Sequence, residues 1–260
     1  MKRTKKSRRS ATCYICVQPG ADTKDHVIPS GFFPQPLPTN LVTLPAHYSC
    51  QNRLSEDYAR AILAGMSYET IPLRVRERVL WSLVKSDLKG RKLRQDVVRT
   101  LVRFEIRSPA GLFLGYTQGV HFDRNRVYPM LEKIVRGLYY HHTGRFLSAN
   151  ARFSWDLFSL GLNESVDLSV FAQCDTGLSY PGVFECRYGI ASDDTVEGSA
   201  WWLRFYEGVV FHCVTSVMIS AATSNVVPPT FSLTTPLPPA RCSLGLRPAR
   251  VHGVGEALVS

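Results

Sequence analysis

The sequence contains no long apolar segment. None of its hydrophobic runs approaches the roughly 20 consecutive apolar residues that a helix needs to cross a bilayer. The basic N-terminal segment is not followed by an apolar stretch, so we expect neither a secretory signal nor contact with a membrane. An internal repeat and a glycine-rich phosphate-binding loop are also missing. A hydrophobic content of 45% still allows a substantial core, in one large domain or two small ones.

Acidic residues are scarce relative to basic ones. The 260 residues include 31 lysines and arginines but 21 aspartates and glutamates, which gives a formal net charge of +10. Such an excess favours a polyanionic partner, and nucleic acid is the simplest one. Residues 1–10 form a basic tail that we expect to be disordered when free. The tail either follows a phosphate backbone or is solvated without a role.

The seven cysteines are not the even set that is typical of a disulfide framework. Three of them belong to two short spacings, Cys13-x-x-Cys16 and His47-x-x-Cys50. Because a separation of two residues lets one tight turn aim two ligands at one point, these four side chains predict a closed, structural Zn²⁺ site. The alternative is a set of buried thiols that bind no metal, with His47 as a core histidine.

The remaining cysteines are irregularly spaced: Cys174, Cys186, Cys213 and Cys242. Irregular spacing favours reduced, buried thiols. We therefore expect the protein to work in a reducing compartment, the cytoplasm.

A second group of polar residues lies between the two metal-binding pairs. Asp25-His26, followed by an apolar pair and Pro29, is typical of a strand that ends in a loop. Residues 40–44 alternate as a second short strand, and residues 49–63 have helical spacing. The predicted order is strand, loop, strand and helix, with a metal-binding pair at each end.

This stretch resembles the HNH endonucleases, the ββα-metal or His-Me finger family, in their zinc-stapled form. The resemblance covers about a fifth of the chain. Pair spacing, order and element type all agree with the family. The residues that carry the resemblance are Cys13, Cys16, Asp25-His26, Pro29, Asn40-Leu41, His47, Cys50 and Asn52-Arg53.

The resemblance implies metal-dependent hydrolysis of DNA phosphodiester bonds. His26 would be the general base that takes a proton from the attacking water, and Asp25 would bind a divalent cation, Mg²⁺ or Mn²⁺. Asn40 would orient the catalytic histidine, or it only caps a turn. The helix-borne cation ligand usually follows the last zinc-binding cysteine directly, where this chain has Gln51. We expect Asn52, one residue later, to be that ligand, with Gln51 as the alternative.

The shifted position of the amide leaves two other functions open. One is a zinc-stapled DNA-binding module whose cutting site is impaired. The other is an effector subunit that stays silent until a partner engages residues 67–222. In each case we expect double-stranded DNA as the ligand, and a protein partner or a homo-oligomer could form through the C-terminal domain.

The expected fold class is α+β, with a small zinc-bound HNH module (residues 11–66) before a mixed helical and antiparallel β domain (residues 67–222). Two basic helices are predicted within residues 72–107, broken at Gly90. Their basic faces are either solvated or a wall that faces the DNA phosphates. Residues 109–115 are expected to be a turn.

A third helix is predicted over residues 123–140, with Gly144 as its stop. The pair His141-His142 near its end is expected to be structural, with a second metal site as the alternative. Strands are expected between residues 152 and 217, and residues 201–214 read as a hairpin. Its aromatic side chains belong to a sheet core or stack on bases. The proline-rich residues 223–260 are expected to be a flexible tail.

Overall fold

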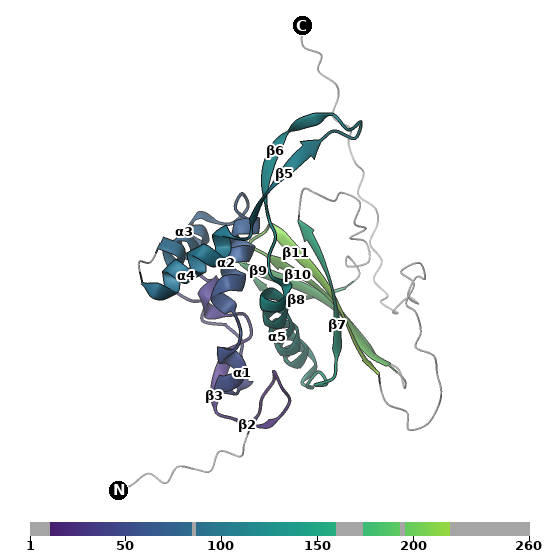
Figure 1. Cartoon of the computed structure of the whole chain (residues 1–260). Helices are drawn as coiled ribbons and strands as arrows, with labels where there is room; N and C mark the ends of the chain where they lie inside the picture. Colours follow the sequence, from purple (N-terminus) through teal and green to yellow (C-terminus); the bar gives the residue numbers. More distant parts are fainter. Residues whose placement is uncertain (1–10, 85–86, 160–173, 193–195, 219–260) are drawn as a thin grey trace, which may run out of the picture. The chain divides into compact units, whose positions relative to one another are not determined.

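The computed structural model describes residues 11–84, 87–159, 174–192 and 196–218 (Figure 1). The expectations for residues 1–10 and 223–260, and for Cys242, lie outside this range. Within it, helices are mixed with strands that all pair antiparallel, so the predicted α+β class is confirmed. No helix of the described ranges combines the length and the apolar character that crossing a bilayer requires.

The N-terminal part contains two short β-hairpins followed by helices. Its elements are β1 (Ala11–Thr12), β2 (Pro19–Ala21), β3 (Thr23–His26), η1 (Ser30–Phe32), β4 (Thr43–Ala46), α1 (Tyr48–Asn52) and α2 (Glu56–Met66). Strand β3 pairs with β4, and α1 begins directly after β4 with His47 at its N-cap. The predicted order of strand, loop, strand and helix is therefore present.

The single helix predicted over residues 49–63 is wrong, because the chain breaks between α1 and α2. Ser55 occupies the N-cap of α2, and Glu56 and Asp57 lie in its first turn. Carboxylates at a helix N-terminus interact favourably with the helix dipole, so these residues favour a new start here over continuation of α1.

The middle part contains helices α3 (Leu73–Val84) and α4 (Leu88–Val98) and the hairpin of β5 (Leu101–Arg107) and β6 (Phe113–Val120). The two helices were predicted, but α4 begins before Gly90 because the Asp87 side chain caps it, accepting a hydrogen bond from the Gly90 amide at 2.6 Å. The prediction that helix extends to residue 107 is wrong. Leu101 and Phe104 have helical spacing, yet their strand pairs with β6.

Helix α5 (Arg124–Thr143) and the strands after it confirm the corresponding predictions. Asp123 caps the helix, and Gly144 ends it with a positive φ of 69°. The strands are β7 (Arg152–Ser159), β8 (Asp175–Tyr180), β9 (Phe184–Ser192), β10 (Val196–Phe205) and β11 (Val209–Met218). They form one sheet in the order β7-β11-β10-β9-β8, in which β10 and β11 are the predicted hairpin.

The sheet packs on α5 through aromatic rings. His142 stacks on Tyr188 with ring centroids 4.2 Å apart, and Tyr128 stacks on Trp155 at 5.7 Å. Trp201 is fully buried. These aromatic side chains therefore belong to the core of the protein.

The N-terminal part also packs against α5. At Gly137, an added Cβ would lie 2.7 Å from Val27 Cγ1 and 3.1 Å from Tyr14 Cε2. Only glycine allows the helix backbone to approach this closely. The buried side chains of both parts form one hydrophobic core.

We predict opposite effects for two glycine substitutions in helices. Gly137→Ala should lower the free energy of unfolding by about 1–3 kcal/mol, because its methyl group overpacks against buried Val27. Gly65→Ala is the matched control, since a Cβ at Gly65 in α2 meets no atom within 4 Å. It should raise the free energy of unfolding by up to about 1 kcal/mol. Denaturant titration measures both, and a stabilising Gly137→Ala would contradict the close packing.

Candidate functional site

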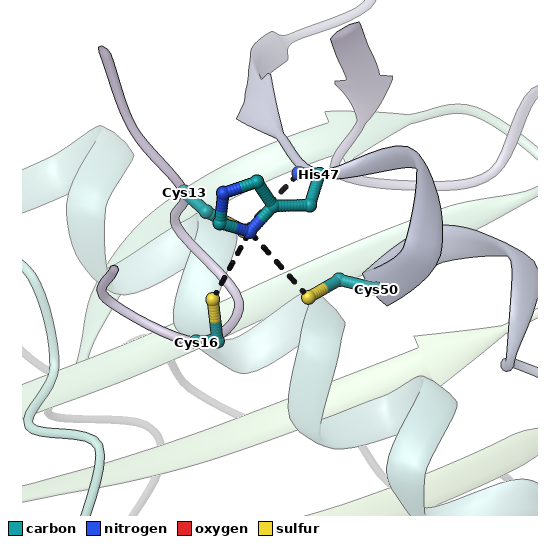
Figure 2. Close-up of side chains that lie close together, drawn as sticks. All are labelled: Cys13, Cys16, His47 and Cys50. Carbon is teal, nitrogen blue, oxygen red and sulfur yellow. Dashed lines mark hydrogen bonds between the residues drawn. The ribbon is translucent and has the colours of Figure 1, made fainter. Parts of the chain in front are cut away.

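The predicted metal ligands converge on one point. Cys13 and Cys16 lie in the turn between β1 and β2, and His47 and Cys50 lie at the start of α1 (Figure 2). Their four ligand atoms all lie within 4.8 Å of one another. The local spacings explain the geometry, because the Val17 amide closes a tight turn onto the Cys13 carbonyl and the Cys50 amide closes one onto the His47 carbonyl.

The distances suit a tetrahedral metal ion. His47 Nδ1 lies 3.3 Å from Cys16 Sγ and 3.8 Å from Cys50 Sγ. Bonds of roughly 2.0–2.3 Å to zinc place tetrahedral ligand atoms about 3.3–3.8 Å apart. The other ring nitrogen, Nε2, lies 3.1 Å from the Pro19 carbonyl oxygen, which can accept a hydrogen bond from Nε2–H and so leave Nδ1 unprotonated as the ligand. The cluster can therefore hold a metal ion, and three thiolates with one imidazole are consistent with structural zinc.

Without a metal, the thiols of the cluster differ in acidity. Burial raises the pKa of the Cys16 thiol, but hydrogen bonds from the Gln18 backbone and from His47 outweigh burial and lower it to about 7. Burial and the neighbouring Cys16 raise the pKa of the Cys50 thiol to about 11. The thiols thus resist ionising together, and a divalent cation is the natural partner for three adjacent thiolates.

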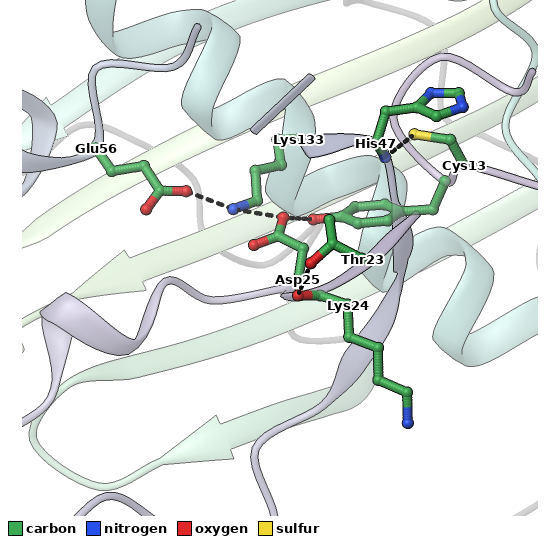
Figure 3. Close-up of polar contacts among 8 residues, drawn as sticks. Cys13, Thr23, Lys24, Asp25, His47, Glu56 and Lys133 are labelled. Atoms are coloured by element: carbon green, nitrogen blue, oxygen red, sulfur yellow. Dashed lines mark hydrogen bonds and ion pairs between the residues drawn. The ribbon is translucent and has the colours of Figure 1, made fainter. Parts of the chain in front are cut away.

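Asp25 is held by two side chains from other elements (Figure 3). Its Oδ2 accepts a hydrogen bond from the Tyr14 hydroxyl at 2.6 Å and forms an ion pair with Lys133 Nζ at 2.7 Å. Lys133 lies on α5, and its Nζ also contacts Glu56 Oε1, at the start of α2, at 2.5 Å. In the described part of the chain, both contacts of the Asp25 carboxylate use the same oxygen, which leaves Oδ1 open to another ligand.

Lys133 is the most deeply buried charge of this group. Its side chain is 0% exposed, against 11% for that of Asp25 and 35% for that of Glu56. A desolvated ammonium group needs close counter-charges, and the two carboxylates supply them. Burial and the nearby Asp25 charge raise the pKa of Tyr14, which keeps its hydroxyl protonated as the donor to Asp25.

The other predicted site residues lie in different environments. His26 is half-buried at the end of β3, opposite Thr43 of β4. Asn40 is exposed, and its carbonyl oxygen accepts a hydrogen bond from the Tyr180 hydroxyl at 3.1 Å. Asn52 is exposed at the end of α1. The Gln51 Nε2 atom is buried and has no hydrogen-bond partner among the described residues.

The histidines and cysteines outside the cluster form no second metal group in the described part of the chain. His142 stacks on Tyr188, as expected of a structural residue. Cys186 and Cys213 are free thiols, and burial raises the pKa of Cys174 and raises that of Cys186 to about 12.

Sequence reasoning did not identify Tyr14, Glu56 and Lys133 as neighbours of Asp25. One signal was available for Lys133, which lies three residues after buried Met130 and four before buried Gly137 on α5. A lysine on the apolar stripe of a helix indicates a buried charge whose counter-charge comes from elsewhere.

Comparison of the chain with protein-family models, with curated proteins and with solved structures finds no match.

We predict that the purified protein contains about one zinc ion per chain, because the four ligands form a closed set. Cys50→Ser should lose most of the zinc and lower the melting temperature, since metal binding contributes folding free energy. Cys213→Ala removes a buried thiol outside the cluster and should keep the zinc. Elemental analysis after gel filtration measures the stoichiometry. The site would be contradicted if the purified wild-type protein contained no zinc and if a chelator did not change its melting temperature.

Lys133→Met should lower the free energy of unfolding by about 3–5 kcal/mol, because it leaves the largely buried Asp25 carboxylate, and the partly exposed Glu56 carboxylate beside it, without a counter-charge. Lys89→Met is the control: Lys89 also pairs with an aspartate, Asp57 at 2.9 Å, but its side chain is 84% exposed. This change should cost less than about 1 kcal/mol. Urea denaturation measures the free energy of unfolding of both variants. If both lose the same amount, burial does not set the strength of the Lys133 ion pairs.

Proposed function

We propose that this protein is a metal-dependent endonuclease of the HNH type that hydrolyses phosphodiester bonds of double-stranded DNA. The observation that carries the proposal is the arrangement around Asp25-His26. The pair ends a β-strand whose hairpin partner leads directly into a helix, and a Cys₃His cluster joins that helix to the preceding turn. The HNH resemblance implies this ββα module with a structural zinc ion.

In this proposal His26 is the general base. It takes a proton from a water molecule, and the oxygen of that water attacks the phosphorus. Asp25 is oriented by Tyr14 and Lys133, which both contact Oδ2. Their contacts fix the carboxylate and leave Oδ1 for a cation.

A bound divalent cation, Mg²⁺ or Mn²⁺, would stabilise the negative charge that develops on the phosphate and the leaving oxygen. Oxygen donors suit both ions, and the chain offers Asp25 Oδ1 together with an amide of α1. The buried Gln51 amide without a partner favours Gln51 over Asn52 as the second donor. The oxygen and nitrogen of an amide are assigned from their partners, so rotating Gln51 places its oxygen at the buried position.

The basic surface suits a phosphate backbone. Helix α4 and the residue after it expose five basic side chains, Lys89, Arg91, Lys92, Arg94 and Arg99. Side chains of this kind supply salt-dependent affinity that is independent of base sequence. Free Cys186 and Cys213 suit a reducing cytoplasm.

One observation favours a second function, a DNA-binding module that does not cut by itself. The Lys133 ammonium group lies 2.7 Å from Asp25 and already compensates the charge of that carboxylate. A positive charge at this position weakens the binding of a second cation, so a partner could be needed to assemble the site.

We predict that the wild-type protein nicks or linearises plasmid DNA with Mg²⁺ or Mn²⁺ and that EDTA stops the reaction. His26→Ala should lower the rate at least about 100-fold, because it removes the general base. Zinc content and melting temperature must match those of wild type, so that loss of activity is separate from loss of fold. Gel electrophoresis of the plasmid measures the rate.

The same assay distinguishes the alternatives. Gln51→Ala should raise the Mn²⁺ concentration needed for half-maximal rate more than Asn52→Ala does, and the reverse order would restore Asn52 as the ligand. If wild type retards DNA on a gel but does not cut it with either ion, the DNA-binding module replaces the nuclease. If His26→Ala cuts as fast as wild type, His26 is not the base.

A further inference from the structure

Helices α3 and α4 are joined by a short turn and pack on the same third helix. Helix α3 ends at Val84 and α4 begins at Leu88, so three residues separate them. Both helices contact α2 as well as each other. Two helices that a turn of this length connects, packed on a third, have the order and spacing of a helix-turn-helix unit. In such units the second helix enters the major groove of DNA, and α4 has that position.

Helix α4 rests on the rest of the protein through one face. That face consists of the buried Gly90 and Leu93 and the half-buried Val97. Asp96, the one acidic residue of α4, lies on the flank of the helix and forms an ion pair with Arg126 at 2.9 Å. The negative charge of the helix is therefore compensated by the protein itself and does not face solvent alone.

The opposite side of α4, which we name its outer face, is lined by exposed side chains. A rotation of about 100° per residue places positions i, i+3, i+4, i+7 and i+11 on one side of a helix. Here these positions are all exposed: Leu88, Arg91, Lys92, Gln95 and Arg99. No carboxylate of the described residues pairs with a cation of the outer face. The face is therefore free to meet an anionic partner.

The chemistry of the outer face matches base edges as well as phosphates. Phosphate binding needs cations, and an exposed leucine contributes nothing to it. In the major groove, arginine pairs with guanine O6 and N7, and glutamine pairs with adenine N6 and N7. An apolar side chain there can contact the methyl group of thymine, and Leu88 is 79% exposed at the start of α4. The outer face offers all three kinds of group.

The dimensions of α4 suit the major groove. Its 11 residues span about 16 Å at a rise of roughly 1.5 Å per residue. The major groove of B-form DNA is about 12 Å wide and admits one α-helix. The first residues of a recognition helix contact the base edges. Leu88, Arg91 and Lys92 all lie within the first five residues of α4.

We propose that α4 is a recognition helix whose outer face enters the major groove of double-stranded DNA and contacts base edges, so that the protein binds preferred base sequences. The inference rests on the DNA partner of the proposed function but does not depend on cutting. It goes beyond the general attraction of basic side chains for phosphates, because a bidentate contact to a base edge discriminates between base pairs.

The experiment selects duplexes that the full-length protein binds from a pool with a random central segment. No divalent cation is added, so binding is measured without cleavage. Duplexes retarded on a gel are recovered, amplified and sequenced over repeated rounds. Wild type should enrich a motif of about four base pairs, because three or four side chains of a recognition helix reach base edges.

Two variants of the outer face test whether α4 reads the motif. Repeating the selection with Gln95→Ala and with Arg91→Ala should relax the preference at one base pair each. Gln95→Ala should also weaken binding to the wild-type motif roughly 5- to 150-fold and leave the affinity for an unrelated duplex unchanged. Arg94→Ala is the matched control, because Arg94 is exposed on the flank of α4. It should weaken binding to both duplexes by the same factor, as expected of a phosphate contact.

A further measurement identifies the groove. Methylation of guanine N7 within the motif should block binding, because N7 lies in the major groove and guanine is the commonest partner of arginine. Undiminished binding to the methylated motif would place the contact elsewhere and overturn the proposal. Zinc content and circular dichroism should be the same for wild type and all variants, since the substituted side chains are exposed.

The outcomes separate this inference from the nuclease. The recognition helix is overturned if wild type retards DNA without enriching a motif, because α4 then contacts only phosphates. It is also overturned if both outer-face variants enrich the same motif as wild type, or if wild type binds no duplex DNA. If wild type enriches a motif that depends on Gln95 or Arg91 but does not cut plasmid with Mg²⁺ or Mn²⁺, the nuclease fails and the recognition helix stands.

Discussion

The buried ammonium group of Lys133 constrains how three parts of the chain meet. Its counter-charges, Asp25 and Glu56, come from β3 and α2, while the lysine belongs to α5. An isolated charge at such depth costs several kcal/mol, so the three elements stabilise one another's positions. The packing of Gly137 against Val27 fixes the same helix against the same hairpin. Charge pairing and close packing therefore select one arrangement of α5 on the N-terminal part.

The metal cluster constrains the same hairpin from its other side. It closes the chain between two ligand pairs, so the hairpin that bears Asp25 is tied at both ends. Tyr14 links the two constraints, because it follows the ligand Cys13 and donates its hydroxyl hydrogen bond to Asp25. The position of the carboxylate therefore depends on the metal ligands through one adjacent residue. A metal ion bound by the cluster would therefore contribute to the geometry around Asp25.

Local features could be predicted from the sequence, and pairings between distant residues could not. The four ligands were evident because each pair fits in one turn, and α5 was evident from its apolar stripe and from Gly144. Residues 101–107 were mistaken for helix, because Leu101 and Phe104 fit both periodicities and only pairing with β6 decides between them. The ion pair between Lys133 and Asp25 spans more than a hundred residues, and only the folded chain brings the two together. The roles of His26, Asn40 and Asn52 remain predictions.

The Tyr180 side chain gives the fold one further property. Its hydroxyl donates to the Asn40 carbonyl and accepts from the Val42 amide, so the end strand of the large sheet holds the loop between β3 and β4. Residues 11–66 are consequently held in place by hydrogen bonds to Tyr180 and an ion pair with Lys133, which both lie far along the sequence. The β3–β4 hairpin therefore depends on α5 and β8 for its conformation. A chimera that transferred the hairpin to another scaffold would need to include these two elements as well.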